Sequence, residues 1–203
     1  MIRSNAEPGS IPLYGRRLVM RQLIPDDFAQ WRAVRTVNEE WLTKWEPARL
    51  NGQPDVVRSR QAFASRCAAR QRERQIGTGY GFGIFVDGHL AGEMNVSSIQ
   101  RGPFQNAYVG YWIDERLAGQ EYTPEALVVA IRFAFEELRL HRLQIAIIPR
   151  NRASRRVVEK LGIRLEGMAE RYLEINGTWE DHLRYAITSE DWQQRKDELS
   201  AWL

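Results

Sequence analysis

The spacing of hydrophobic positions changes several times along the chain, and each change predicts a different type of element. A two-residue period is typical of half-buried strands, and a period near 3.6 residues is typical of helices. Strands are predicted at residues 16–23, 80–86, 90–98, 107–114, 142–148, 163–174 and 179–187. Helices are predicted at residues 25–36, 38–45, 54–75, 124–138 and 151–161, with a last one from about residue 190.

Turn residues and the order of the elements indicate the fold class. Asp87-Gly88 and Asn176-Gly177 are typical of two-residue turns between antiparallel strands. The helix predicted at residues 124–138 is apolar over much of its circumference, so we expect it to be buried. It connects two strands as a parallel crossover. The sequence therefore predicts an α/β fold whose central sheet is mixed, mostly antiparallel and flanked by helices.

Length and composition favour one globular domain over residues 1–203, with a loose arm at residues 1–12. Hydrophobic residues make up 43% of the 203 residues and charged residues 27%, which excludes a disordered or fibrous chain. No stretch reaches the roughly 18 to 20 apolar residues of a membrane span. The first residues also lack the apolar segment of a signal peptide. We therefore expect a soluble protein with no membrane partner.

Charge and cysteine content narrow the function classes further. The formal net charge is only +3, too small to indicate direct binding to nucleic acid. The single cysteine, Cys67, cannot form an internal disulfide, which favours the reducing cytoplasm. Its apolar helical setting favours a structural role. The three histidines are far apart in the sequence, so no metal site is expected.

The segment from Tyr108 to Ala126, YVGYWIDERLAGQEYTPEA, carries the most chemical information. A predicted strand leads into a short polar loop and then into a helix that begins near Thr123 and Pro124. Free backbone N–H groups and the positive end of the helix dipole suit this turn to an anion such as a pyrophosphate. Gly119 would let the ligand approach the backbone closely. An ordinary strand-to-helix turn is the alternative.

Three blocks of sequence resemble the GNAT acetyltransferase family. RLAGQEYTPEA resembles its loop pattern Q/R-x-x-G-x-G/A, in which Arg116 and Gly119 match and Glu121 departs. IPRNRASRRVVEKLG and the closing NGTWEDHLRYAITSEDW follow in the family's order. The resemblance covers roughly residues 12 to 193 and is to the RimJ/RimL branch, RimJ more than RimL. Its members acetylate N-terminal amines of ribosomal proteins.

This resemblance implies an N-acetyltransferase that uses acetyl-CoA as co-substrate and needs no metal. The acceptor would be a peptide or protein N-terminus, with a ribosomal protein as a candidate, attacked directly in a ternary complex. We expect a monomer or a homodimer. The residues that the family pattern assigns to CoA are Tyr111, Trp112, Ile113, Arg116, Ala118, Gly119, Gln120, Glu121, Tyr122, Thr123, Asn151 and Arg156.

The predicted catalytic residues are Glu93 and Ser154. Strand alternation puts Glu93, Asn95 and Ser97 on one face and Leu90, Gly92, Met94 and Val96 on the other. A polar face on a covered sheet suggests a cleft, where Glu93 would act as base; a solvated face is the alternative. The resemblance makes the Ser154 hydroxyl the acid that protonates the CoA thiolate, with Tyr172 and Tyr185 as weaker candidates. An N-terminal helix position explains Ser154 equally well, and Asn151 would cap that helix.

The sequence leaves two interpretations open for an arginine cluster, for three tryptophans and for the function. Arginines cluster after the strand at residues 142–148, where they would bind the 3′-phosphate of CoA or an acidic partner, or lie on a solvated helix face: Arg150, Arg152, Arg155 and Arg156. Tryptophans on the early helices would line the acceptor groove or belong to the core: Trp31, Trp41 and Trp45. A small-amine acetyltransferase is the rival function. A non-catalytic CoA-binding or ribosome-associated protein is the second rival, suggested by Glu121.

Overall fold

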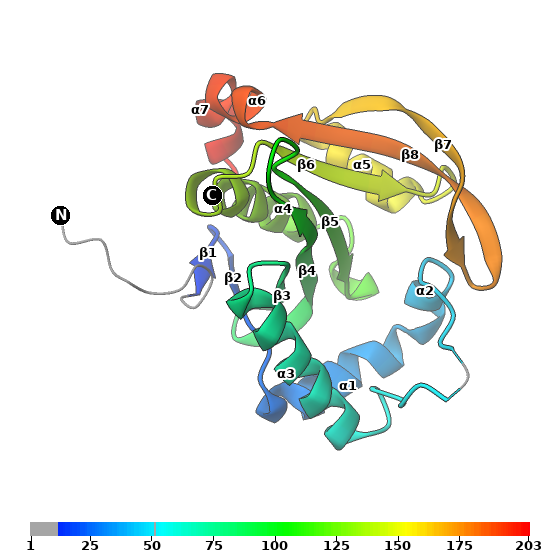
Figure 1. Ribbon diagram of the computed structural model, residues 1–203. Coiled ribbons are helices and arrows are strands. Elements are labelled where there is room, and N and C mark those ends of the chain that lie inside the picture. The colour runs from blue at the N-terminus through cyan, green and yellow to red at the C-terminus, as the bar shows by residue number, and fades with distance from the viewer. Residues whose placement is uncertain (1–11, 51) are drawn as a thin grey trace.

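The computed structural model describes residues 12–50 and 52–203, and Figure 1 shows the chain as a ribbon. The arm expected at residues 1–12 lies outside the described residues except for Pro12. One sheet of eight strands has the order β1-β2-β3-β4-β5-β6-β8-β7. Its strands are β1 (Leu13–Tyr14), β2 (Leu18–Arg21), β3 (Tyr80–Val86), β4 (His89–Gln100), β5 (Asn106–Ile113), β6 (Arg142–Ile147), β7 (Arg164–Ile175) and β8 (Thr178–Thr188).

Helices cover the sheet on both faces. Those before β3 are η1 (Pro25–Asp27), α1 (Phe28–Val37), α2 (Glu39–Thr43) and α3 (Arg60–Gln75). Those after β5 are η2 (Glu115–Leu117), α4 (Tyr122–Arg132), η3 (Phe133–Glu137), α5 (Arg152–Lys160), α6 (Ser189–Gln194) and α7 (Lys196–Ser200). Across the described residues, none of these helices combines the length and apolar character needed to cross a bilayer. The predicted mixed, mostly antiparallel sheet flanked by helices is confirmed.

The pairing of β5 with β6 creates an opening inside the sheet. All other neighbouring strands of the sheet are antiparallel, whereas β5 and β6 are parallel. Their register contains only the pairs Asn106 with Arg142, Ala107 with Leu143, and Tyr108 with Gln144. Beyond Tyr108 the two strands diverge, as Figure 1 shows. The last part of β5 therefore presents its outer edge to a gap and not to a neighbouring strand.

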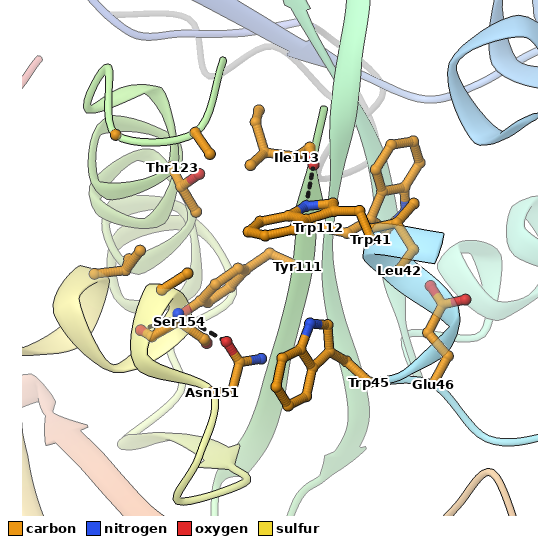
Figure 2. Close-up of a pocket in the computed structure, with 14 residues that line it drawn as sticks. Trp41, Leu42, Trp45, Glu46, Tyr111, Trp112, Ile113, Thr123, Asn151 and Ser154 are labelled. Carbon is orange, nitrogen blue, oxygen red and sulfur yellow. Dashed lines mark hydrogen bonds between the residues drawn. The ribbon is translucent and has the colours of Figure 1, made fainter. Parts of the chain in front are cut away.

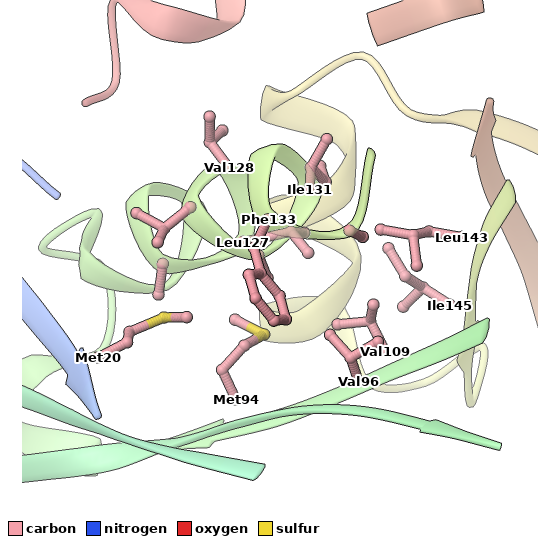
Figure 3. Packing of buried hydrophobic residues seen from close by; sticks show 14 of the residues in the cluster. Met20, Met94, Val96, Val109, Leu127, Val128, Ile131, Phe133, Leu143 and Ile145 are labelled. Carbon is pink, nitrogen blue, oxygen red and sulfur yellow. The ribbon is translucent and has the colours of Figure 1, made fainter. Parts of the chain in front are cut away.

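Helix α4 fills the main core on one face of the sheet. Every residue from 123 to 131 is buried, which confirms the burial predicted for this helix. Figure 3 shows Leu127 and Phe133 directed at Met94 of the sheet. Phe133 also packs edge-on against Tyr80 and Phe82, at ring distances of 5.2 and 5.4 Å. Because full burial of each large apolar side chain contributes about 1.5–3 kcal/mol, this packing holds α4 firmly against the sheet.

A β-bulge corrects one detail of the predicted alternation in β4. Ile84 pairs with Gly92 and Phe85 pairs with Leu90, so Ala91 is an extra residue in the ladder. Ala91 consequently belongs to the core under α4, whereas Leu90 packs on the opposite face with Trp31. Met94 and Val96 share one face, as predicted, and this face lies against α4. Leu90 does not share it, because the bulge reverses the alternation.

The predicted element boundaries hold for most of the chain but differ near the N-terminus. The helix expected from residue 54 begins at Arg60, since the Ser59 side chain accepts a hydrogen bond from the Ala62 N–H and caps it. The strand predicted at residues 16–23 is shorter in the structure, where β2 covers only Leu18–Arg21. A turn in which the Gly15 N–H donates to the Leu18 carbonyl connects β2 with its short partner β1. A two-residue strand is too short for a recognisable hydrophobic period.

Candidate functional site

A pocket opens where β5 leaves β6, and its walls come from four parts of the chain. Figure 2 shows Thr123, Ser154 and Asn151 along one wall and Trp41, Leu42 and Glu46 along the opposite wall, with the end of β5 between them. The full lining is Trp41, Leu42, Trp45, Glu46, Tyr111, Trp112, Ile113, Ala118, Gly119, Thr123, Asn151, Ala153, Ser154 and Val157. Seven of the predicted CoA residues are therefore brought together: Tyr111, Trp112, Ile113, Ala118, Gly119, Thr123 and Asn151.

The loop before α4 has the geometry of an anion site. Gly119 has φ of 81° and Glu121 has φ of 70°, both in the left-handed region. The first N–H groups of a helix have no intrahelical acceptor, and the Glu121 side chain makes no capping bond to α4. Pro124 follows and has no N–H to satisfy. The amides of Tyr122 and Thr123 are thus directed outward at the positive end of a helix, where a diphosphate would be stabilised.

The Glu121 side chain is paired with a lysine of the neighbouring helix. Its carboxylate accepts from Nζ of Lys160 on α5 at 2.7 Å. This ammonium lowers the pKa of Glu121, so the side chain is a paired carboxylate at neutral pH. The position has the backbone conformation that glycine adopts most easily, which explains why the family pattern has a small residue there.

Arg17 ties the first hairpin to the same loop, and sequence analysis did not identify it. Its backbone N–H and its Nε donate to the buried Glu125 carboxylate, at 2.6 and 2.9 Å. Its Nη1 donates to the Gln120 carbonyl at 3.1 Å, and its guanidinium lies 4.5 Å from the centre of the Tyr122 ring. Nothing in the spacing of the sequence connects Arg17 with residues 103 to 108 positions later.

Arg116 is held by the preceding strand end. Its Nη2 donates to the Asp114 carboxylate at 2.5 Å, and its backbone N–H donates to the same side chain at 3.0 Å. These contacts hold the pKa of Asp114 below its ordinary value. The side chain is therefore engaged within the loop, and its predicted contact with CoA stays a prediction. The same holds for the exposed Arg156, one turn before Lys160 on α5.

The start of α5 carries the predicted acid. Asn151 Oδ1 accepts from the Ser154 N–H at 3.1 Å, so Asn151 is the helix cap that the sequence analysis described. The Ser154 hydroxyl donates to the Tyr111 hydroxyl at 3.1 Å, and that hydroxyl lies 3.3 Å from the Ser154 carbonyl. Burial raises the pKa of Tyr111, so the phenol stays protonated. Two neutral hydroxyls therefore meet at the pocket wall.

The alternative hydroxyls lie elsewhere. Tyr172 donates to the Tyr108 hydroxyl at 3.3 Å on the face of the sheet opposite α4, and Tyr185 is buried in the main core. The arginine cluster is also divided, because Arg150 pairs with Glu180 of β8 and Arg155 pairs with Glu159. Neither Tyr172 nor Tyr185 lines the pocket.

The backbone of β5 supplies polar groups at the gap. Asp114 N donates to the Ala91 carbonyl, so alternation also directs the amide of Trp112 toward β4. The amides of Tyr111 and Ile113 then face the outer edge, where β6 has left. The Ile113 carbonyl accepts from Nε1 of Trp41 at 3.2 Å. Two N–H groups, those of Tyr111 and Ile113, are therefore directed into the gap and are candidates to donate to an oxyanion there.

Glu93 lies behind the pocket wall on the face covered by α1 and α3. Its side chain is almost fully buried, at 2% exposure. One oxygen accepts from Trp31 Nε1 at 2.6 Å and the other from Arg66 Nη2 at 2.5 Å. The predicted base is thus a paired carboxylate, and that role stays a prediction that requires Arg66 or Trp31 to move aside. Trp31 belongs to the second core cluster.

A second cavity adjoins the first, and the two share Glu46 and Trp112. It is lined mainly by the α1 end, the segment after α2 and the buried Glu93. Glu46 accepts from both terminal nitrogens of Arg35, at 2.7 and 2.6 Å. Sequence analysis missed Glu46 and Arg35, because neither belongs to a periodic pattern or a family motif.

The part of the chain that the structure describes contains no group of three or more His, Cys, Asp or Glu side chains placed to hold a metal ion. Cys67 is buried between α3 and the sheet, and burial raises the pKa of its thiol.

Comparison with known proteins agrees with this geometry. A family model described as an acetyltransferase (GNAT) domain matches residues 17–164. The probable N-acetyltransferase YjcK of Bacillus subtilis is 33% identical over 184 residues, which cover 90% of this chain and 99% of that protein. The [ribosomal protein uS5]-alanine N-acetyltransferase of Escherichia coli is 30% identical over 178 residues, which cover 87% of this chain and 90% of that protein. The structure of Mycobacterium smegmatis RimJ in complex with CoA-disulfide matches with a TM-score of 0.80 and 30% identity. The match covers 89% of this chain and 87% of that chain.

Proposed function

Because the chain belongs to the GNAT acetyltransferase family, and within it to the RimJ/RimL-like branch, we propose that it acetylates the N-terminal α-amine of a protein, with a ribosomal protein as the first candidate. The enzyme is an acetyl-CoA-dependent N-acetyltransferase. The printed name of the Escherichia coli relative includes ribosomal protein uS5 as acceptor, and that name motivates the candidate. The proposal puts the reaction in the cytoplasm, where ribosomal proteins are made.

One observation carries the proposal: the pocket that opens where β5 leaves β6 is lined by Gly119 and Thr123 at the start of α4. We infer that the diphosphate of acetyl-CoA binds at the first amides of α4 and that the extended arm enters the gap between β5 and β6. Asn151 and Ser154 on one side and the edge of β5 on the other would contact that arm. The thioester would then lie beside Tyr111, within reach of the second cavity.

The proposed chemistry needs three roles from the chain. An α-amine has a pKa of about 8 and is mostly protonated at neutral pH, so a base must take its proton. Glu93 is the proposed base. The amides of Tyr111 and Ile113 are the proposed donors to the oxyanion that forms when the amine attacks the thioester. Ser154, polarised by its hydrogen bond to Tyr111, is the proposed acid for the departing thiolate.

The second cavity supports a polypeptide acceptor over a small amine. It continues from the first pocket through Trp112 and Glu46 and extends to Asn176 in the turn between β7 and β8. A small-amine enzyme would need only a closed recess beside the thioester. The pairing of Glu121 with Lys160 weakens the case for a non-catalytic protein, because the ammonium neutralises the carboxylate that would otherwise repel a phosphate at this loop.

The test is acetyl transfer to a panel of N-terminal peptides and small amines, with acetyl-CoA binding measured by calorimetry. We expect saturable binding of acetyl-CoA and kcat/KM values for several peptides at least tenfold above those for small amines. Faster transfer to a small amine would favour the rival enzyme. Binding without any transfer would favour the non-catalytic rival, and no binding at millimolar concentration would overturn the proposal.

A further inference from the structure

Glu46 is the carboxylate that the two cavities share. The first pocket has Glu46 as the acidic member of its described lining, and the second has Glu46, Asp55 and Glu93. Glu46 is about one-third exposed at its side chain. Glu46 therefore lies between the proposed position of the thioester in the first pocket and an acceptor molecule that enters through the second cavity.

The position of Glu46 is fixed on two sides. Arg35 donates to both carboxylate oxygens, in the bidentate arrangement that orients a carboxylate most strongly. The Glu46 backbone carbonyl accepts from the Asn176 N–H at 3.2 Å, which ties the segment after α2 to the β7–β8 turn. An ionised carboxylate has about four lone-pair sites, so two bonds to Arg35 leave capacity for another donor.

Aromatic rings surround the same place. Figure 2 shows the side chains of Trp41, Trp45 and Trp112 around the cavity next to Glu46. Ring faces attract cations. Three of the protein's own cations already use these rings: Arg35 lies 5.2 Å from the centre of Trp112, Lys44 5.0 Å from that of Trp41, and Arg150 5.6 Å from that of Trp45. A carboxylate with indole rings is a combination that suits an amino group.

The other two carboxylates of the second cavity do not line the first pocket. Glu93 is almost fully buried and bonded through both oxygens to Trp31 and Arg66. Asp55 accepts from the backbone N–H groups of Val57 and Arg58, and so holds the turn before α3. Among these three carboxylates, Glu46 alone lines both cavities.

We infer that Glu46 receives the amino group of the acceptor and that the following residues of the polypeptide lie in the second cavity. This inference rests on the proposed function. Glu46 accepts an N–H hydrogen bond from the amine, Arg35 holds the carboxylate in place, and the indole rings limit the space around the nitrogen. The peptide then leaves between the segment after α2 and the β7–β8 turn. The ligand class is an extended polypeptide with a free N-terminal amine.

The experiment compares Glu46→Gln and Glu46→Asp with wild type and with the control Glu40→Gln, an exposed residue of α2. The substrates are one peptide accepted by wild type and one small amine, each titrated at saturating acetyl-CoA. We expect E46Q to raise the KM values of both the peptide and the small amine at least tenfold. E46D should raise these KM values less, and E40Q should match wild type. The Kd for acetyl-CoA should stay within twofold in all variants.

A binding measurement separates an amine contact from a general disturbance. The N-acetylated form of the peptide lacks the free amine, so it should inhibit wild type and E46Q equally, whereas the free peptide should bind E46Q more weakly. An unchanged KM in E46Q, or equal loss of both peptide forms, would overturn the inference. If E46Q does not fold, the same comparison in E46D decides, with unchanged KM again overturning it.

The failure of the proposed function would look different. If wild type acetylates small amines and not peptides, the polypeptide acceptor is wrong, and with it the placement of a peptide in the second cavity. The effect of E46Q on KM for the small amine would then still report whether Glu46 receives the amino group.

Discussion

Nζ of Lys160 lies 2.7 Å from Oε1 of Glu121, so a charge on α5 and a charge at the cap of α4 neutralise each other beside the predicted diphosphate site. The pair links the two helices that form one wall of the pocket. It also explains how a carboxylate is tolerated at a position where the family pattern has glycine or alanine. Because both side chains are largely exposed, the link is weak enough for a phosphate to compete for Lys160.

We predict that Glu121→Gly tightens acetyl-CoA binding by about two- to fivefold, within the range expected for an exposed charge pair. The change removes a negative charge and frees Lys160. It also replaces a left-handed non-glycine residue, so Tm should rise slightly. Calorimetric titration with acetyl-CoA measures the effect. Lys160→Gln is the matched variant and should weaken binding; weaker binding by E121G would contradict the prediction.

The pair between Glu93 and Arg66 should matter for both turnover and stability. Glu93→Gln removes the proposed base and leaves Arg66 without its anionic partner, which costs about 1–3 kcal/mol of unfolding free energy. We expect kcat to fall by about 10²-fold or more, as for loss of a general base. Rates are measured from mildly acidic to mildly alkaline pH, with urea unfolding in parallel.

Arg66→Met provides the comparison for Glu93. It breaks the same ion pair and leaves the carboxylate in place, so it should lower stability by a similar amount without removing the proposed base. If E93Q loses stability but keeps wild-type turnover across the pH range, Glu93 has a structural role and the base must be sought elsewhere.

The two hydroxyls at the pocket wall should differ in their effect. Ser154→Ala removes the proposed acid and should lower kcat by about 10- to 100-fold with little change in the Kd for acetyl-CoA. Tyr111→Phe removes only the group that polarises Ser154, so its effect should be smaller. Burial raises the pKa of Tyr111, so no loss of rate from its ionisation is expected at alkaline pH. A larger fall in kcat for Y111F than for S154A would indicate that Tyr111 is the acid and Ser154 the group that polarises it.

Acid stability should depend on Asp114. The Arg116 guanidinium holds the pKa of Asp114 below its ordinary value near 3.9. A depressed pKa in the folded state contributes stability above the unfolded value, and that contribution is lost as pH falls through the folded value. Wild type should therefore lose Tm more steeply than Asp114→Asn as the pH falls below about 4. If Tm falls with pH at the same rate in both proteins, the Asp114 carboxylate does not contribute to acid stability.

Sequence periodicity predicted the architecture because it reports burial directly. The apolar circumference of residues 124–138 identified the central buried helix, and the parallel crossover followed from the order of elements. The bulge at Ala91 could not be predicted, because one extra residue changes pairing without changing composition. The short β1 was missed because two residues carry no period.

The sequence predicted the wall of the pocket that contains Gly119, Thr123 and Asn151, and on the opposite wall only the tryptophans Trp41 and Trp45. Gly119, Thr123 and Asn151 belong to continuous motifs whose local geometry follows from helix starts. Glu46 and Arg35 meet Trp112 only through tertiary packing of α1 and α2 against the end of β5. The Glu93 ion pair was hidden for the same reason, because Arg66 is 27 residues away in sequence.

The brief contact between β5 and β6 has a consequence for the behaviour of the protein without substrate. Unpaired strand edges attract other extended chains and promote association. Here the unpaired edge lies inside a continuous sheet, flanked by α4 and α5, so an incoming strand has little room to dock on it. The unpaired N–H and C=O groups of β5 thus stay accessible to a narrow ligand. The same position protects them from pairing with a strand of another molecule, which at an open sheet edge promotes aggregation.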